Sequence, residues 1–258
     1  MEISGYRFLC IDDDEELMEK AYKLRYSVYC KEVKYLNPDD YDDSMEIDEF
    51  DKYSIHFAAL NENNEVLGTL RLVLNSDLGF PLEHHCREYD KTKIDFSRNN
   101  LAEISRLAVD KSFRRRKDDG MFGVESYDGD ANNEVSKEIR EKRKRPIIVV
   151  GLYKMMYMES KRRGITHWYA AMEEKLNKAL NHFSFKFEAI GPVQDYSGPV
   201  IPFLGNIQEI EEEVFRNKPE LLHLMVYGLE SSNMPKFGVF FPLKNLIFIK
   251  IAKLMGKI

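Results

Sequence analysis

Hydrophobic and polar positions along the chain follow two different periods, and together these periods predict a mixed α/β protein. Alternating or continuous apolar runs predict strands at residues 6–11, 54–60, 66–74, 102–109, 165–172 and 185–190. Apolar residues spaced three or four positions apart predict one helix that ends near residue 30 and two more at residues 147–161 and 173–183. The polar turn 61–65 is typical of a hairpin between the two strands that flank it.

The order of these elements predicts the fold class. It runs strand, helix, three strands, helix, strand, helix and strand, which is typical of an α/β sandwich built on a mixed sheet. The motif G-x-G-x-x-G does not follow the first strand, so a Rossmann domain is excluded.

Composition divides the chain into one domain, a polar insertion and a C-terminal extension. Residues 1–195 hold all the predicted strands. Residues 111–146 are highly polar and contain several glycines, which predicts a long and partly mobile insertion. Residues 196–258 are expected to form a helical extension. Its last part, 237–258, is apolar but interrupted by lysines, so it either packs on the domain as an amphipathic helix or touches the inner face of the membrane.

Net charge and cysteine content limit the classes of binding partner and the cellular compartment that we expect. The net charge of -6 argues against general nucleic-acid binding. The three cysteines are scattered without metal-ligand spacing, which favours reduced thiols in a cytoplasmic protein that has no metal site. Against this acidic background, residues 114–117 and 140–145 are dense in cations, a pattern that suits a small acidic partner better than DNA.

Opposite charges within an apolar strand are the clearest sign of chemistry. Glu103 and Arg106 lie three positions apart in the strand 102–109, on either side of Ser105. Because a buried ion pair rarely improves stability over a hydrophobic pair, its presence indicates a site that handles charge. Three is an odd offset, so the two side chains are expected on opposite faces unless a bulge re-aims one of them. Glu103 is then the expected general base, and Arg106 organises the acidic loop from the other side.

A second charged residue interrupts the strand 66–74. Arg71 is expected to be held by a carboxylate of the protein or to receive one from a ligand. The acidic segment 33–50, which precedes these strands, is predicted to be an irregular loop.

These charged residues form an ordered set that resembles known acyltransferases. In order and approximate spacing the set resembles the signature of the acyl-homoserine lactone (autoinducer) synthases, GNAT-like enzymes that join a fatty acyl group from acyl carrier protein to an amine. Several segments resemble more closely the long-chain N-acyl amino acid synthases, including the acyltransferases associated with PEP-CTERM/exosortase systems. The resemblance covers about residues 5–190. The residues that carry the resemblance are Arg25, Tyr29, Tyr35, Asp48, Asp51, Arg71, Glu103 and Arg106.

The resemblance implies a fold and a reaction. The fold is a GNAT-like acyl-CoA N-acyltransferase sandwich with splayed central strands. The reaction moves a long-chain acyl group from the phosphopantetheine of acyl carrier protein to the amine of an amino acid, with no permanently bound cofactor. Glu103 takes the amine proton, and Arg71 or Arg25 binds the carboxylate of the acceptor. The substrate-binding residues are Tyr29, Tyr35, Asp48, Asp51, Ser105 and Arg106.

The acyl tail is expected in an apolar cleft between the splayed strands. Met155, Trp168 and Met172 are expected to line this cleft, since methionine adapts to flexible ligands. Tyr153 and Tyr157 are candidates for the acid that protonates the leaving thiolate. A basic patch is expected to dock the acidic carrier protein through Arg114, Arg115, Arg116, Arg143, Lys144 and Arg145.

Two departures from the family pattern leave alternatives open. Tyr29 and Tyr35 stand where autoinducer synthases carry Phe and Trp, and the glycine-rich phosphate loop of CoA-dependent relatives is missing. One alternative is an autoinducer synthase that uses S-adenosylmethionine. The other is a non-catalytic protein that binds lipid or acyl carrier protein on the same fold.

Overall fold

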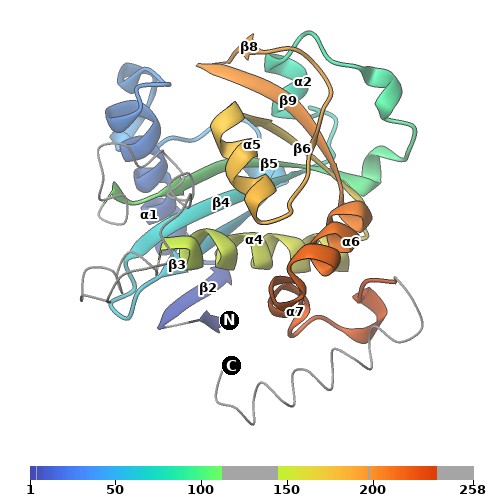
Figure 1. Ribbon diagram of the computed structural model, residues 1–258. Coiled ribbons are helices and arrows are strands. Elements are labelled where there is room, and N and C mark those ends of the chain that lie inside the picture. Colours follow the sequence, from blue (N-terminus) through green and yellow to red (C-terminus); the bar gives the residue numbers. More distant parts are fainter. Residues whose placement is uncertain (4, 112–144, 197, 237–258) are drawn as a thin grey trace, which may run out of the picture.

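One twisted sheet organises the chain (Figure 1). The computed structural model describes residues 1–3, 5–111, 145–196 and 198–236. In this part of the chain the strand order is β1-β2-β3-β4-β5-β6-β9-β7, and β8 also pairs with β9. The strands are β1 (Glu2–Ile3), β2 (Tyr6–Cys10), β3 (Ser54–Leu60), β4 (Val66–Leu74), β5 (Leu101–Val109), β6 (His167–Met172), β7 (Glu188–Ala189), β8 (Gln194–Asp195) and β9 (Pro199–Asn206).

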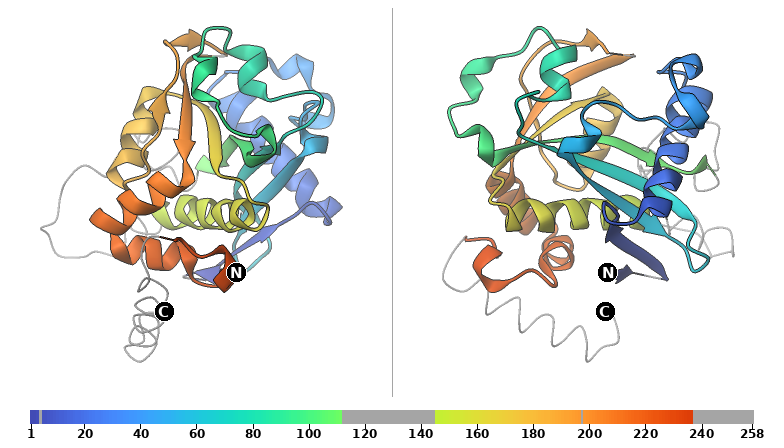
Figure 2. Two further views of the ribbon diagram at one scale, coloured as in Figure 1. Left: turned by 90° about the vertical axis from the view of Figure 1, so that its right-hand side faces the viewer. Right: turned by 180° about the vertical axis from the view of Figure 1, so that it is seen from behind.

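Helices cover both faces of the sheet. They are α1 (Glu15–Tyr26), α2 (Pro81–His85), α4 (Arg145–Arg162), α5 (Glu174–His182), α6 (Ile207–Asn217) and α7 (Pro219–Val226). Side chains of β3 alternate between two clusters, since Phe57 belongs to the core beneath α4 and Ala58 to the core beneath α1. Accordingly, α4 crosses the face seen in Figure 1 and α1 the face seen from behind in Figure 2.

A glycine on α4 sets the distance between this helix and the sheet. A Cβ atom at Gly151 would lie 2.2 Å from the ring of Phe8, which is buried on β2. Any side chain there would push the helix away from the sheet, so the glycine is required by close packing.

The sheet opens between its two central strands. β5 and β6 run parallel and pair only from Leu101↔His167 to Glu103↔Tyr169. β5 stays paired with β4 beyond this point, and β6 stays paired with β9 as far as Met172. The inner edges of β5 and β6 therefore separate and leave a gap in the sheet. The expected GNAT-like sandwich with splayed central strands is confirmed.

Most of the elements up to residue 183 were predicted from the sequence, including the helix at 173–183, which is α5, whereas the strands after α5 were not. The strands at 54–60 and 66–74 are confirmed at both ends as β3 and β4. The strand predicted at 185–190 is wrong in length, because only Glu188–Ala189 pair. The expected helical extension from residue 196 is also wrong at its start, because β9 pairs with β6 along its whole length and belongs to the main sheet. Two prolines and a glycine within β9 hide its strand pattern.

Beyond β9, α6 and α7 pack against the core on the side of α4, and the described residues after α7 form turns and one short 3-10 helix. No helix among the described residues is both long and apolar enough to cross a membrane. Of the insertion predicted at 111–146, residues 112–144 lie outside the described residues, and its last two residues belong to α4. The predicted membrane contact at 237–258 also lies outside the described residues.

Candidate active site

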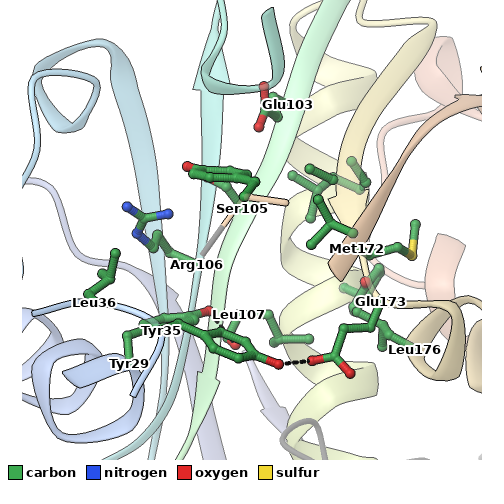
Figure 3. A pocket seen from close by; sticks show the side chains of 16 residues that line it. Tyr29, Tyr35, Leu36, Glu103, Ser105, Arg106, Leu107, Met172, Glu173 and Leu176 are labelled. Atoms are coloured by element: carbon green, nitrogen blue, oxygen red, sulfur yellow. Dashed lines mark hydrogen bonds between the residues drawn. The ribbon is translucent and has the colours of Figure 1, made fainter. Parts of the chain in front are cut away.

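A cavity of about 110 Å³ occupies the gap between the splayed strands (Figure 3). Its walls come from β5, from the end of β6, and from the segment that follows α1, while α4 and α5 add apolar side chains. The charged side chains in its wall are Glu103, Arg106 and Glu173. The other lining residues are Tyr29, Tyr35, Leu36, Ile104, Ser105, Leu107, Tyr153, Ala170, Ala171, Met172, Leu176, Tyr196 and Val200.

A bulge brings Glu103 and Arg106 to the same cavity. Arg106 has a φ of +51°, and the register of β4 against β5 shifts between Thr69 and Arg71. This extra residue cancels the odd offset of three positions. Arg106 does bind the acidic loop, through Glu46 and Asp48, as expected. The expectation that it does so from the other side of the strand is corrected, because Glu103 and Arg106 both line the cavity.

Glu103 is a buried acid with little to stabilise its charge. Its side chain is only 2% exposed and accepts one hydrogen bond, from the backbone N–H of Leu82 at 2.8 Å. Burial raises the pKa of Glu103 to about 8, although the Leu82 N–H and the nearby Arg71 and Arg106 partly oppose the rise. A carboxyl with this pKa exchanges a proton near neutral pH, as a general base or acid must.

Behind the cavity, three arginines alternate with three carboxylates. Arg25 binds Glu46 and Asp51, Arg71 binds Asp48 and Asp51, and Arg106 binds Glu46 and Asp48. The distances from Arg71 Nη1 are 2.6 Å to Asp48 Oδ1 and 2.9 Å to Asp51 Oδ1.

The arginines keep this network ionised. Burial alone would raise the pKa of each carboxyl, but neighbouring cations and hydrogen bonds lower all three pKa values, that of Asp51 well below its usual range. The acidic loop is thus tied to α1, β4 and β5 by charge.

Two members of the network were missed by the sequence analysis. Glu46 is fully buried between Arg25 and Arg106, but in sequence it is one acid in an acidic run. His56 extends the network, with Nε2 2.9 Å from Asp51 Oδ1 and Nδ1 2.7 Å from Asp12 Oδ1. Burial lowers the pKa of His56, yet the two hydrogen bonds outweigh burial and raise it. A histidine in an otherwise apolar strand was the available signal.

The predicted catalytic and substrate-binding residues fall into two groups. Those that line the cavity are Tyr29, Tyr35, Glu103, Ser105, Arg106 and Met172. Those that lie behind it, in the charged network, are Arg25, Asp48, Asp51 and Arg71. The expectation that Arg71 is held by a protein carboxylate is confirmed.

Arg71 also keeps free donor capacity. Its Nε donates to Ser105 Oγ at 3.0 Å, while Nη2 is buried and has no hydrogen-bond partner among the described residues. Nε and Nη2 form one edge of the planar guanidinium, so this edge carries one free donor next to a serine of the cavity wall. A buried donor without a partner is costly unless a ligand or water satisfies it.

Two of the expected acyl-lining residues lie elsewhere. Trp168 is fully buried before the strands separate, where its Nε1 donates to Ser160 Oγ and its ring stacks on Phe187. Met155 packs half-buried against the main core. Both expectations are corrected.

The two tyrosines expected as candidates for the acid lie in different parts of the structure. Tyr153 lines the cavity, and burial raises its pKa. Tyr157 lies in the core instead, where its hydroxyl donates to Glu211.

A hydrogen bond closes one side of the cavity. The Tyr35 hydroxyl donates to Glu173, which joins the segment after α1 to the start of α5 (Figure 3). Glu173 was not expected in the site, because it directly follows a strand and reads as the start of a helix.

Other predicted features lie beyond what the structure describes. The carrier-docking residues Arg114, Arg115, Arg116, Arg143 and Lys144 are outside the described residues, and the side chain of Arg145, at the start of α4, is not described either. Within the described ranges, no cluster of His, Cys, Asp and Glu could hold a metal ion.

Comparison with known proteins matches this architecture. Residues 24–122 match the acetyltransferase (GNAT) domain family. No curated protein matches the chain in sequence. Among solved structures, TofI in a ternary complex with an inhibitor and MTA has a TM-score of 0.58 at 14% identity, covering 88% of this chain and 100% of TofI. The CoA-dependent acyl-homoserine lactone synthase BjaI, with SAM and isopentyl-CoA, gives 0.57 at 17% identity, with 88% and 90% covered.

An N-acyl amino acid synthase is also similar. FeeM, from uncultured soil microbes, has a TM-score of 0.50 at 14% identity, and the match covers 82% of this chain and 94% of FeeM. At such identities the shared property is the fold. The described part of the chain thus has the fold of these synthases, and its residues 24–122 are similar to the acetyltransferase (GNAT) domain family.

Proposed function

We propose that this protein is an N-acyltransferase that moves a long-chain acyl group from acyl carrier protein to the amine of an amino acid. The observation that carries the proposal is the position of Glu103, a buried acid facing a largely apolar cavity where β5 and β6 separate. Apolar walls suit an acyl chain, and the acid suits an amine that must lose a proton.

Glu103 can take a proton from the acceptor ammonium only if the pKa values of the two groups are comparable. The α-amino group of a peptide has a pKa of about 8, and the carboxylate of a free amino acid raises this value by stabilising the ammonium form. Glu103 has a pKa of about 8, so it is a base of comparable strength. The deprotonated carboxylate takes a proton from the ammonium. The free amine then attacks the thioester carbon and the C–S bond breaks. The nitrogen loses its second proton as the amide forms, and the departing thiolate takes up one proton to leave as the thiol.

Backbone groups at the unpaired edges of β5 and β6 can polarise the thioester carbonyl. After Glu103 and Tyr169 the ladder between β5 and β6 stops, so backbone groups of both inner edges lack their strand partner. A backbone N–H there can donate to the thioester carbonyl oxygen as negative charge develops on it. Tyr153, whose ring lines the same cavity, is the candidate for the acid that protonates the thiolate.

We assign the acceptor carboxylate to the free edge of Arg71, which lies behind Ser105 and is not itself part of the cavity wall, so Ser105 must shift to admit it. Nη2 has no partner among the described residues, and Ser105 Oγ links Nε to the cavity wall. A carboxylate oxygen that accepts from Nη2 would satisfy this buried donor. A simple amine has no carboxylate to satisfy this donor, so binding through Arg71 would favour an amino acid as the acceptor.

The direct test is transfer by the purified protein. Acyl carrier protein loaded with a long-chain acyl group is incubated with each amino acid, and N-acyl products are measured by mass spectrometry. We expect Glu103→Gln to lower kcat about 10²- to 10⁴-fold, the usual contribution of a general base.

The pH profile separates a base from a structural residue. For wild type, kcat/KM should rise as pH increases through about 8, because the carboxylate of Glu103 then becomes populated. The Gln variant should retain only the rise that comes from the acceptor amine. Near-normal turnover of a folded Gln variant would remove Glu103 as the base.

An autoinducer synthase is the second candidate. TofI and BjaI were solved with MTA or SAM bound, and this chain shares their fold. Release of methylthioadenosine from S-adenosylmethionine during acyl transfer would identify this reaction, and its absence alongside an N-acyl amino acid product would exclude it.

A further inference from the structure

The proposed reaction leaves Glu103 with a proton that must reach solvent. An ammonium and a thioester become an amide, a thiol and one released proton, and Glu103 holds this proton at the end of each turnover. Its side chain is only 2% exposed and lies at the end of the cavity opposite the hydrogen bond between Tyr35 and Glu173 (Figure 3). While substrate or product fills the cavity, the proton can leave only through the protein.

Tyr169 is the neighbour of Glu103 on the side away from the cavity mouth. The two residues are partners in the last pair of the β5–β6 ladder, so their side chains point to the same face of the sheet. Both lie beneath α2, because Leu82 donates its backbone N–H to Glu103 and shares a core cluster with Tyr169. A proton on Glu103 therefore has a tyrosine beside it.

The hydroxyl of Tyr169 has no structural use that the described residues reveal. The residue is fully buried, and its hydroxyl has no hydrogen-bond partner among them. A buried polar group without a partner lowers stability, and phenylalanine would fill nearly the same space without one. An unpaired hydroxyl next to a proposed base points to a role in its chemistry.

A second tyrosine and a second acid connect Tyr169 with the surface. The ring centroids of Tyr89 and Tyr169 lie 6.3 Å apart, and the Tyr89 hydroxyl is 3.5 Å from Glu83 Oε1. Tyr89 is half-buried and the Glu83 side chain is 17% exposed, so this row of polar side chains ends in water. Burial raises the pKa of Tyr169, and the neighbouring Glu83 and Glu103 raise it further, which places both acids within electrostatic reach of the hydroxyl.

We propose that Tyr169 relays the proton of Glu103 to the surface at Tyr89 and Glu83. This rests on the proposed function, in which Glu103 takes that proton from the acceptor. The O–H bond of the Glu103 carboxyl breaks as the Tyr169 oxygen accepts the proton. The original Tyr169 O–H bond breaks as its proton passes to the Tyr89 oxygen, and Tyr89 gives up its own proton to water. Glu103 is a carboxylate again and no tyrosinate forms. The hydrogen bonds of such a relay are often long before substrate binds and tighten in the complex.

First-turnover kinetics of Tyr169→Phe test the relay. Because the pKa of Glu103 is about 8, about half of the molecules start with its carboxylate at pH 8, and these complete one turnover without the relay. Rapid quenching should thus show the first N-acyl product forming as fast as in wild type, in a burst of about half an equivalent. Later turnovers wait for the proton to leave, so kcat should fall about tenfold or more. The value of kcat/KM should stay the same, because at low substrate the proton has time to leave. An unchanged kcat, or a first turnover slowed as much as the later ones, overturns the relay.

A matched variant separates the relay from damage to the fold. Tyr157→Phe makes the same substitution at a buried tyrosine whose hydroxyl donates to Glu211. It should unfold at lower urea concentration yet turn over at the wild-type rate. Tyr169→Phe should do the opposite, with an unfolding midpoint equal to or above that of wild type and a lower kcat. A lower midpoint for Tyr169→Phe would show that the hydroxyl has a structural partner, and the relay would then be wrong.

Failure of the relay and failure of the proposed function give different results. If wild type forms no N-acyl amino acid, the proposed function fails and the relay fails with it. If wild type and Tyr169→Phe turn over equally fast, only the relay fails. Tyr89→Phe interrupts the same route nearer the surface and should show the same burst with a lower kcat. If Tyr169→Phe alone lowers kcat, the exit through Tyr89 is wrong.

Discussion

Arg25 is the residue whose role differs most between sequence and structure. By sequence it is one position after an apolar helix residue, and alone it would be solvated; the family resemblance places it among catalytic residues. In the fold it is 1% exposed and binds Glu46 and Asp51, away from the cavity wall. Removing one partner from a buried charge network leaves the others uncompensated, which costs more than the pair contributes.

We therefore predict that Arg25→Met acts on folding. Without the guanidinium, Glu46 and Asp51 lose a shared cation, so the free energy of unfolding should fall by about 3–5 kcal/mol. Urea unfolding followed by circular dichroism measures this loss. Lys23→Met, at an exposed position on the same helix, should change it by less than about 0.5 kcal/mol. If Arg25→Met were fully stable but inactive, Arg25 would act on substrate directly.

At the level of elements, periodic patterns were predictable and long-range pairing was not. β3 and β4 each alternate or run apolar over their whole length, so both ends could be predicted. β9 could not, because its prolines are tolerated only through its particular place beside β6 and β7.

In the candidate site, too, local features were predictable from the sequence and long-range contacts were not. Glu103 was identified because a charge in an apolar strand needs a reason. The bulge at Arg106 was not, because a bulge depends on the register against β4 and no glycine marks it. Burial of Arg25 depends on the acidic loop folding back over α1, a contact between residues far apart in sequence.

Helix α4 provides a prediction about acyl-chain length. Tyr153 lines the cavity and also borders a smaller apolar hollow, whose other walls include Val149, Leu180 and Phe185. Tyr153→Ala should join the two spaces, so the variant should prefer acyl chains longer than those preferred by wild type.

Competition between acyl donors of different length, read by mass spectrometry of the products, measures this preference. Met155→Ala serves as the control, since Met155 lies on the same helix but lines neither space. An unchanged length profile for Tyr153→Ala would mean that the acyl chain does not extend toward α4. If Tyr153 is also the acid, kcat should fall for every chain length alike, which leaves the length profile readable.

For the whole molecule, the site imposes opposite pH dependences on stability. The lowered pKa values of Glu46, Asp48 and Asp51 contribute stability that is present above their ordinary pKa values and lost as pH falls through the folded ones. His56 behaves in the opposite sense. Its raised pKa contributes stability below its ordinary value of 6.5, and this is lost as pH rises through the folded pKa.

Glu103 should cost the protein stability in the pH range where it would work as a base. Its pKa is about 8 in the folded protein against a usual value of 4.5, so between these values the folded state binds more protons than the unfolded state. The free energy of unfolding therefore falls as pH rises through this window. Glutamine keeps the uncharged form and can still accept from the Leu82 N–H. Glu103→Gln should then be about as stable as wild type near pH 4 and more stable by up to about 4 kcal/mol at pH 9.

Urea unfolding of both proteins across this pH range measures the difference, and Glu83→Gln provides a control of opposite sign. Glu83 precedes β5 and binds Arg98, and although burial opposes the change, its hydrogen bonds and ion pair with Arg98 lower its pKa. Its charge thus contributes stability above pH 4.5, and Glu83→Gln should be less stable than wild type at pH 9. A Glu103→Gln variant that gains nothing at pH 9 would mean that Glu103 is ionised without cost in the folded protein, and its assignment as a base tuned by burial would fail. A gain in stability together with a loss of turnover would show that the fold tolerates an unfavourable charge for the sake of the reaction.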